Sequence, residues 1–271
     1  MSNASNFFLR ILDKNMARVK AAYNAAKSLV ISRFISNNAR VLHIGTGTDI
    51  LKYDPHAPRD VILLGDSEES LQIGISFGND KKIQYAIGMH VTKIFTDFFT
   101  DQSTTVYHPT MVVPRRVRLR GVNLVTTFSV LEQCSEITQL EHLCQQIAQS
   151  LEPGGIWVGC VTNGTRLLDR CDGNGCYQDT YCNIEMMENS GTYRFTTTKR
   201  DCHQTLWTLP TIVRMAEQHG LKLCLQESLL DVLGNAREHE YVNRKLRLQL
   251  DDFPPLSLVL FFSFFKPDPA I

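Results

Sequence analysis

The sequence predicts an α/β fold in which a mostly parallel β-sheet is covered by helices on both faces. Short apolar runs typical of buried strands alternate along the chain with amphipathic segments of helical period, and this alternation predicts parallel strand pairing. A glycine-containing turn follows the first apolar run and an acidic residue ends the second, which is typical of doubly wound sheets. With 271 residues, 43% of them hydrophobic, the chain can bury one sizeable core.

The first half of the chain opens with an amphipathic helix. Apolar side chains between residues 14 and 36 recur every three or four positions, which is the period of one helix face. The short apolar runs that follow are rich in Val, Ile and Leu, as expected for strands buried on both faces. After this helix we expect, in order, strand Arg40–Ile44, strand Asp60–Leu64, helix Glu68–Phe77, a short strand near Ile83–Ile87 and a helix near Val91–Phe99.

Strands and helices continue to alternate in the second half. The segment Pro153-Gly154-Gly155 is a stop signal for the helix before it, and Gly220 is positioned to end a later helix. We expect, in order, strand Val122–Thr127, helix 136–151, strand Ile156–Val161, helix 209–219, strand Leu221–Gln226, helix 236–249 and strand Leu256–Phe265.

A cofactor-binding pattern follows the first two strands. Gly45 and Gly47 come directly after the first strand, where glycines let the backbone turn tightly and approach a ligand closely. Asp66 ends the second strand, where an acidic residue can hydrogen-bond a ribose hydroxyl. The third glycine of the dinucleotide fingerprint is absent, so the pattern favours S-adenosylmethionine over NAD. A plain loop also explains the two glycines, and Asp49 is well placed to cap a helix.

Four segments of the chain resemble the mRNA cap guanine-N7 methyltransferases of large cytoplasmic DNA viruses, of the African swine fever virus or poxvirus type. The first segment looks like the stretch before the family's first strand, the second like its glycine motif, the third like its ribose-binding turn, and the fourth like its later strand and polar loop. Together they extend over most of the chain: 23–31, 45–53, 65–71 and 151–167.

This resemblance implies a fold and a division of the chain. The fold would be that of a class I S-adenosylmethionine-dependent methyltransferase, Rossmann-like, with a mostly parallel seven-stranded sheet. Residues 1–271 would form a single methyltransferase domain. An N-terminal helical segment (1–39) would precede a cofactor-binding half (40–161) and a cap-binding, C-terminal half (162–271).

The resemblance also implies S-adenosyl-L-methionine as cofactor. The family carries a lysine that contacts the methionine carboxylate, and Lys27 stands at the matching position. On spacing alone Lys27 is equally well explained as a solvated helix lysine. The expected cofactor-binding residues are Lys27, Gly45, Gly47, Asp49, Asp66, Ser67, Phe128 and Ser129.

On the substrate side the chain departs from the family pattern. Phe128 matches the aromatic that would stack on the cap guanine, but the His-Tyr pair that follows in the family is replaced by Glu132 and Gln133. A family glutamate aligns with Gln204, beside His203. Phe128 and Glu132 are the expected substrate-positioning residues, and the expected cap or RNA contacts are Phe128, Glu132, Gln133, Asn163, Arg166, His203, Gln204, Arg116, Arg118 and Arg120.

The arginines lie in the one dense basic cluster of a chain whose formal net charge is +0 and whose pI is near 7.1. Alternate spacing puts Arg116, Arg118 and Arg120 on one face of an extended chain, and arginine forks suit phosphate oxygens. A solvated edge strand is the competing interpretation, because charged edges also prevent aggregation. A general polyanion binder would be more basic, so we expect nucleic-acid contact only through this local patch.

The expected reaction is methyl transfer from S-adenosylmethionine to N7 of the cap guanine of viral mRNA. Guanine N7 has a free lone pair, so catalysis would depend on proximity and alignment and not on a general base. The expected partners are 5′-capped RNA and other domains of a larger capping enzyme. Two alternatives stay open: a methyltransferase for another substrate, and a non-catalytic RNA-binding methyltransferase-like subunit.

The cysteines and the hydropathy bear on metal sites and on location. Cys171, Cys176, Cys182 and Cys202, with His203, lack the paired two-residue spacing of zinc sites, so no structural metal is expected. The polar start predicts no signal peptide, and the apolar run Leu256–Phe265 is too short to span a bilayer as a helix. We expect free thiols, no membrane contact and a place in the host cytoplasm; the resemblance also allows packaging in the virion.

Overall fold

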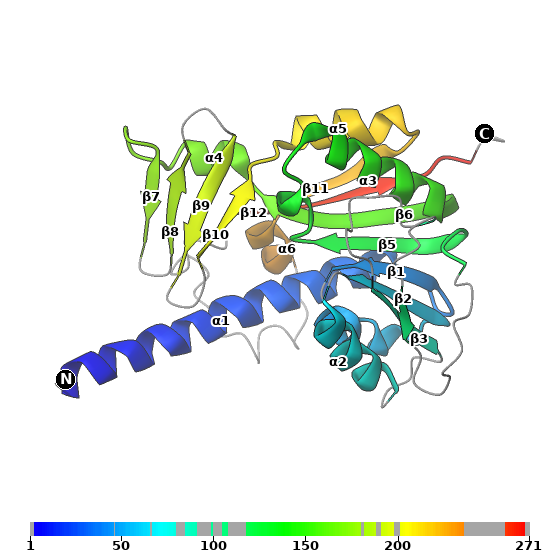
Figure 1. The fold of residues 1–271 in the computed structure, drawn as a ribbon, viewed down its shortest axis with the longest axis horizontal. Coiled ribbons are helices and arrows are strands. Elements are labelled where there is room, and N and C mark those ends of the chain that lie inside the picture. Colours follow the sequence, from blue (N-terminus) through cyan, green and yellow to red (C-terminus); the bar gives the residue numbers. More distant parts are fainter. Residues whose placement is uncertain are drawn as a thin grey trace.

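The computed structural model of the chain describes residues 3–45, 47–65, 67–79, 85–90, 99, 105–107, 118–179, 182–187, 191–197, 201–235 and 258–268. Within them, eight strands form one sheet in the order β11-β12-β6-β5-β1-β2-β3-β4 (Figure 1). Their bounds are β1 Arg40–Ile44, β2 Asp60–Gly65, β3 Tyr85–His90, β4 Thr105–Tyr107, β5 Val122–Phe128, β6 Leu151–Thr162, β11 Lys222–Ser228 and β12 Val259–Phe265.

Most of this sheet is parallel. Strands β3, β2, β1, β5 and β6 pair in parallel, whereas β12 is antiparallel to both of its neighbours and β4 is antiparallel to β3 at the edge. Parallel strands need cover on both faces, and β1 and β2 are buried along almost their whole length. The carboxyl ends of the parallel strands therefore meet at one edge of the sheet, which is where ligands bind in such folds.

Helices cover the two faces with separate apolar clusters. Alternate residues of β1 point to opposite faces, so Leu42 joins the cluster under α3 and α5, while Val41 joins the cluster under α1, α2 and α6. In Figure 1 the amino-terminal part of α1 projects beyond the sheet. The helices are α1 Asn3–Phe34, α2 Glu68–Asn79, α3 Ile137–Ser150, α4 Gly164–Leu168, α5 Leu209–Gln218 and α6 Leu229–Asn235.

A second, smaller sheet lies between α4 and α5 in the sequence. Its strands are antiparallel, in the order β10-β9-β8-β7, and Figure 1 shows it beyond the carboxyl ends of β5 and β6. The strands are β7 Cys176–Gln178, β8 Asn183–Met186, β9 Thr192–Thr196 and β10 Asp201–Thr205. Its buried side chains, among them Tyr193 and Ile184, form a third apolar cluster with Leu167 of α4.

The structure confirms the predicted α/β class and the order of most elements. Helix α1 begins at Asn3 and not near residue 14, in a stretch free of glycine and proline, and the third strand lies at Tyr85–His90 and not at Ile83–Ile87. The edge strand β4, the four strands of the small sheet and the helices α4 and α6 were not predicted. The helices expected near Val91–Phe99 and at 236–249 lie outside the described residues, apart from Phe99.

Two further observations concern the chain as a whole. Each of the eight cysteines is a free thiol, and half of them are buried. Across the described ranges, no helix combines the length and the apolar character needed to cross a membrane.

Candidate cofactor and acceptor site

Two glycines shape the carboxyl ends of β1 and β2. Gly45 has φ +134°, a conformation that side chains disfavour, and its amide donates to the carbonyl of Leu64 at 2.8 Å. A Cβ on Gly65 would lie only 2.8 Å from the carbonyl oxygen of Gly45. The two strand ends can approach this closely because Gly65 has no side chain, while a Cβ on Gly45 would lie 3.2 Å from Val130. Gly47 begins the 3-10 helix Gly47–Lys52, and Asp66 lies outside the described residues.

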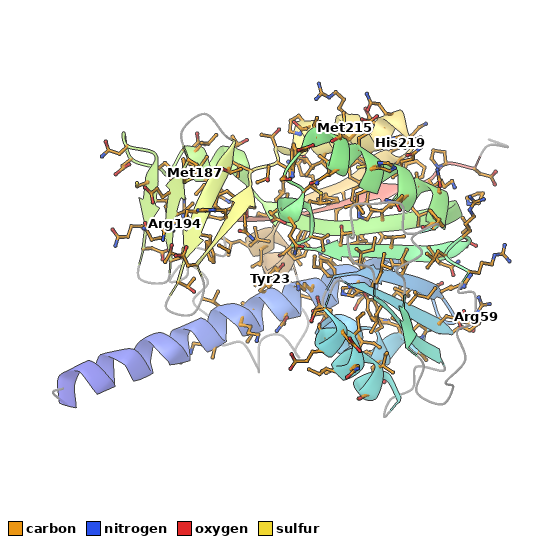
Figure 2. All side chains as sticks on the ribbon, viewed as in Figure 1. Tyr23, Arg59, Met187, Arg194, Met215 and His219 are labelled. Carbon is orange, nitrogen blue, oxygen red and sulfur yellow. The ribbon has the colours of Figure 1, made fainter. Side chains whose placement is uncertain are left out.

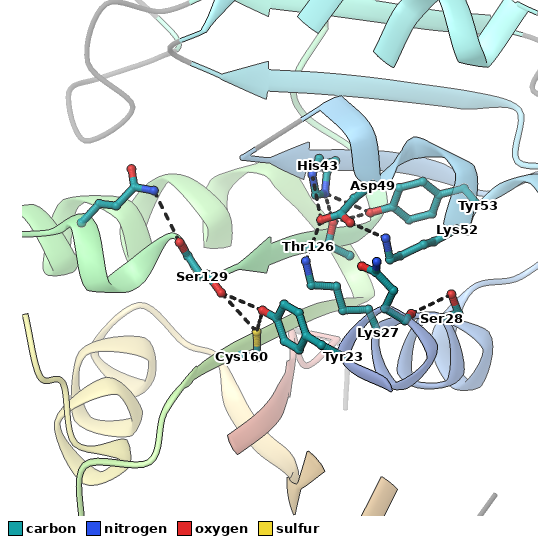
Figure 3. A network of polar contacts seen from close by, with 12 residues as sticks. Tyr23, Lys27, Ser28, His43, Asp49, Lys52, Tyr53, Thr126, Ser129 and Cys160 are labelled. Atoms are coloured by element: carbon teal, nitrogen blue, oxygen red, sulfur yellow. Dashed lines mark hydrogen bonds and ion pairs between the residues drawn. The ribbon is translucent and has the colours of Figure 1, made fainter. Parts of the chain in front are cut away.

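A buried charge cluster lies beside this turn (Figure 3). The Lys27 ammonium of α1 donates to Oδ2 of Asp49 at 3.0 Å, and the Lys52 ammonium donates to Oδ1 of the same carboxylate. Asp49 is 4% exposed and Lys27 7%, so both charges are largely removed from water. Two lysines therefore share one carboxylate, which leaves the cluster with a positive charge in excess.

The electrostatics keep Asp49 ionised. Burial raises the pKa of this carboxyl, but Lys27, His43 and Lys52 oppose the effect and lower the pKa to about 2. Burial likewise lowers the pKa of Lys52, and Asp49 acts against that shift. An ion pair this deeply buried costs desolvation energy, so its partners must be well matched.

A second set of hydrogen-bonded polar groups packs next to the charge cluster. His43 on β1 and Thr126 on β5 are register partners, and Nδ1 of His43 lies 2.8 Å from Oγ1 of Thr126. The Tyr53 hydroxyl contacts both of them, at 3.1 and 2.5 Å respectively. Nε2 of His43 is 3.9 Å from Oδ2 of Asp49. This network fixes the 3-10 helix that carries Asp49 against the ends of β1 and β5.

Helix α1 closes the site from the other side. The Tyr23 hydroxyl lies 2.6 Å from Oγ of Ser129 and 2.9 Å from Sγ of Cys160, which tie α1 to the ends of β5 and β6 (Figure 3). Ser129 has φ +55°, which is uncommon for a residue with a side chain. The Lys27 ammonium lies over two rings, 4.4 Å from that of Tyr23 and 5.1 Å from that of Phe128.

Phe128 itself is part of the core. Its side chain is 6% exposed and packs against His43 and Phe261, with ring centroids 6.4 and 6.3 Å apart. The structure therefore places Phe128 under the Lys27 ammonium. A stacking role on a substrate base, which we expected from the sequence, would need this ring to become accessible.

Glu132 is the most unusual residue at the end of β5. It lies in the 3-10 turn Leu131–Gln133, is 5% exposed, and accepts the backbone N–H of Thr162 on Oε1 at 2.9 Å. Its other oxygen, Oε2, is buried and has no hydrogen-bond partner among the described residues. Burial raises the pKa of Glu132 to about 7, although the Thr162 hydrogen bond acts in the opposite direction.

A short chain of hydrogen bonds joins this region to the small sheet. The hydroxyls of Thr162 and Tyr193 are 2.8 Å apart, and the Tyr193 hydroxyl donates to Oε1 of Gln204 at 2.8 Å. Tyr193 is buried on β9, and Gln204 is its register partner on β10. Gln204, expected as a substrate contact, thus points toward β6 but already accepts a hydrogen bond within the protein.

The remaining expected contacts near the strand ends have local structural roles. The Ser67 hydroxyl accepts the backbone N–H of Ser70 at the start of α2, and the Gln133 amide donates to the Ser129 carbonyl at 3.4 Å. The Asn163 side chain caps α4 by accepting the backbone N–H of Arg166. Asn163 and Arg166 also line a hollow of about 680 Å³ beside α5 and β11.

Three of the expected contacts that the structure describes are not brought to the site. His203 is exposed and pairs with Arg194, so it lies on the face of the small sheet opposite to Gln204. Figure 2 labels Arg194 on this small sheet. Arg118 and Arg120 precede β5 and therefore lie at the amino-terminal edge of the main sheet, where their carbonyls accept from the Arg40 guanidinium. Arg116 lies outside the described residues.

The described part of the chain was also compared with the requirements of a metal site. No group of three or more His, Cys, Asp or Glu side chains there is arranged to hold a metal ion. Of the four cysteines considered in the sequence for a zinc site, Cys182 is buried, and the Cys202 thiol lies 3.9 Å from the carbonyl of Phe195.

Several site residues were missed in the sequence. Lys52 and Tyr23 lie in the segments 45–53 and 23–31, but neither was expected to be a site residue. One signal was available: His43 is the polar residue in the apolar run Val41–Ile44, which suggests a buried hydrogen-bond network. Thr162 and Tyr193 had no signal, because their contact depends on how the small sheet packs on the main one.

Comparisons with known proteins define the fold. No protein-family model matches the sequence, and no curated protein matches it either. An S-adenosylmethionine-dependent methyltransferase from Clostridium acetobutylicum matches in structure with a TM-score of 0.56, over 98% of this chain and 100% of that one, at 11% identity. The CcbJ methyltransferase from Streptomyces caelestis matches with a TM-score of 0.57, over 90% of each chain, at 12% identity.

The [4+2]-cyclase SpnF also matches, with a TM-score of 0.53, over 90% of this chain and 81% of that one, at 11% identity. At such low identities the likeness concerns the fold alone. The chain has the class I S-adenosylmethionine-dependent methyltransferase fold, with β4 as an additional edge strand beside the seven expected ones.

Proposed function

We propose that this chain is an S-adenosylmethionine-dependent methyltransferase and that its methyl acceptor is N7 of the guanine of capped RNA. The observation that carries the proposal is the buried cluster of Lys27, Asp49 and Lys52 at the carboxyl end of β1. Its excess positive charge would be balanced by the carboxylate of the methionine part of the cofactor. The glycines at the ends of β1 and β2 leave room for close backbone approach.

The residues present fit this cofactor. Lys27 is the cation best placed to hold the carboxylate, because it comes from α1 and faces the loop that follows β1. Asp66 is the residue from which we expect the contact to the ribose. The solved structures with the same fold that are named S-adenosylmethionine-dependent methyltransferases support this choice of cofactor.

The chain's own part in the reaction is to bind and align. Once bound, S-adenosylmethionine supplies an electrophilic methyl group. Lys27, held by Asp49 and the rings of Tyr23 and Phe128, would orient the cofactor at the end of β1. Guanine N7 needs no proton removed before it accepts a methyl group, so proximity and exclusion of water would provide the rate enhancement.

The choice of acceptor depends on the four segments that resemble the cap guanine-N7 methyltransferases. The positions of His203, Arg118 and Arg120 favour the alternative, a methyltransferase with another acceptor, because these expected cap contacts lie away from the strand ends. Capped RNA is therefore the first acceptor to test, followed by a panel of other nucleosides, proteins and small molecules.

The decisive experiment measures transfer of labelled methyl groups from S-adenosylmethionine to RNA with an unmethylated guanosine cap. Lys27→Met should abolish cofactor binding, while Lys20→Met, an exposed lysine on the same helix, is the matched control. Label on guanine N7 that depends on Lys27 supports the whole proposal. Cofactor binding without labelled RNA would refute the acceptor, and absence of cofactor binding would refute the enzyme class.

A further inference from the structure

The free oxygen of Glu132 needs a physical explanation. Oε2 is out of contact with water and has no hydrogen-bond partner among the described residues, whereas Oε1 is satisfied by the Thr162 N–H. Buried polar atoms in folded proteins are nearly always hydrogen-bonded, and the exceptions often have a functional role. The Thr162 N–H orients the carboxyl through Oε1, which leaves Oε2 as a buried acceptor that has no donor among the described residues.

The neighbouring donors are already committed. The Tyr193 hydroxyl donates its proton to Gln204, so in the pair of Thr162 and Tyr193 hydroxyls it is Thr162 that donates. The Tyr23 hydroxyl is shared between Ser129 and Cys160. None of these hydroxyls donates a hydrogen bond to Oε2, although the Thr162 hydroxyl and the backbone N–H of Glu132 lie close enough to lower the pKa of the carboxyl.

The position of Glu132 indicates where a donor to Oε2 would come from. Glu132 follows β5, the strand next to β1, and Thr162 connects it to the small sheet. It thus lies between the proposed cofactor cluster and the sheet beyond the strand ends, where a methyl acceptor would bind. Because Oε2 is covered in this structure, an acceptor contacts it only after a neighbouring side chain moves.

We propose that Glu132 selects the methyl acceptor, with Oε2 accepting a hydrogen bond from an N–H group of a heteroaromatic base such as guanine. The inference rests on the proposed function and deepens it, because it names the chemical feature that the acceptor must present. The role falls to Glu132 and not to Gln204, whose amide oxygen is occupied by Tyr193.

The assignment makes acceptor binding dependent on pH. Burial raises the pKa of Glu132 to about 7, and only the ionised carboxylate accepts on both oxygens. The acceptor should therefore bind more tightly as the pH rises through this value. The titratable groups that interact with Glu132 are Lys27 and Tyr23 from α1, Cys160 from β6, Tyr193 from β9 and Cys134 next to its own turn.

The test compares Glu132→Gln with Glu136→Gln, an exposed glutamate four residues away, in methyl transfer to a capped dinucleotide. Glutamine keeps the acceptor for Thr162 but replaces Oε2 with an amide nitrogen. We expect KM for the dinucleotide to rise at least about tenfold, the loss typical of a hydrogen bond to a charged group. The rise of kcat/KM with pH should disappear, and the cofactor Kd should stay unchanged; Glu136→Gln should behave as wild type.

An unchanged KM and pH profile in Glu132→Gln would overturn the assignment, and so would a parallel loss of cofactor binding and of thermal stability, which indicates a structural role. A failure of the proposed function looks different. In that case the wild-type protein itself leaves the capped dinucleotide unlabelled while it binds the cofactor, and the assignment of Glu132 to such a base falls with it.

Discussion

Two lysines depend on one buried carboxylate at the end of β1. Lys27 and Lys52 both contact Asp49, and the three side chains are shielded from water. Because the pKa of Asp49 is lowered to about 2, its stabilising effect is present at neutral pH and is lost only as the pH falls through that value. Asp49 thus stabilises the fold and positions the lysine that the proposed cofactor needs.

The first prediction concerns the loss of this carboxylate. Asp49→Asn leaves Lys27 and Lys52 without a counterion, and removing one partner of a buried ion pair typically costs about 3–5 kcal/mol. We expect the free energy of unfolding in urea at pH 7 to fall by that order. Asp169→Asn, at an exposed position, is the control. Equal stability of the two variants would show that the cluster is not buried in solution.

Glu132 should make the protein less stable as the pH rises, whereas Asp49 makes it less stable as the pH falls. Its folded-state pKa is about 7 and its ordinary value 4.5, so between these values the folded state holds a proton that the unfolded chain has lost. The wild type should therefore lose stability as pH rises from about 4.5 to 7, by at most about 3 kcal/mol. Chemical denaturation at pH 5 and pH 8 measures this change, which Glu132→Gln should not show.

At the scale of elements, polar contacts through Tyr193 join the small sheet to the main sheet. The hydroxyl pair of Thr162 and Tyr193 connects the last residue of β6 to β9, and Gln204 extends the contact to β10. The connection is close to Glu132, so the small sheet is positioned to form one wall of the acceptor site.

This attachment leads to a prediction for Tyr193. Tyr193→Phe removes the hydroxyl between the two sheets, and we expect a loss of about 1 kcal/mol in stability together with a higher KM for the methyl acceptor. Cofactor affinity, measured by calorimetry, should not change. Tyr177→Phe removes a hydroxyl of the same sheet that bonds Asp179, and it should reduce stability without affecting KM. A KM effect of equal size in both variants would mean that only the stability of the sheet matters.

The same scale shows what could be predicted from the sequence. Strands β1, β2 and β5 were predicted almost to the residue, because an apolar run bounded by polar residues leaves little ambiguity. The strands of the small sheet were missed because they have only three to five residues and mix polar with apolar side chains. Such short strands are stabilised by pairing with neighbours and not by their own pattern.

The residues of the candidate cofactor site were also predicted only in part. The family resemblance pointed to Lys27 and Asp49, and the fold brings their charged groups to 3.0 Å from each other. Their partner Lys52 and the network of His43, Tyr53 and Thr126 depend on the register of β1 against β5, which only the folded chain defines. The free oxygen of Glu132 likewise results from packing, so no motif could have indicated it.

At the scale of the whole molecule, the fold determines where a ligand binds but not which reaction occurs. Proteins named as methyltransferases and one named as a cyclase have the same architecture as this chain. Chemistry in such a fold is determined by the side chains at the strand ends. The acceptor of this protein must therefore be identified from Glu132 and its surroundings.

The two edges of the sheet should accordingly differ in function. Arg118 and Arg120 lie at the amino-terminal edge, and the seven residues of β5 separate them from the site by about 20 Å. A variant with both arginines changed to alanine should therefore retain the wild-type KM for a capped dinucleotide, which is too short to reach them. The measurement is a pair of KM values, for the dinucleotide and for a longer capped RNA, at two salt concentrations.

A higher KM for the longer RNA alone, with weaker salt dependence, would mean that the RNA extends around the sheet to phosphate contacts at the far edge. A higher KM for the dinucleotide would contradict the placement of the site at the carboxyl ends of the strands. The chain has no net charge, and its one dense basic cluster in the sequence includes these arginines, so this edge is where phosphate contacts beyond the cap are expected.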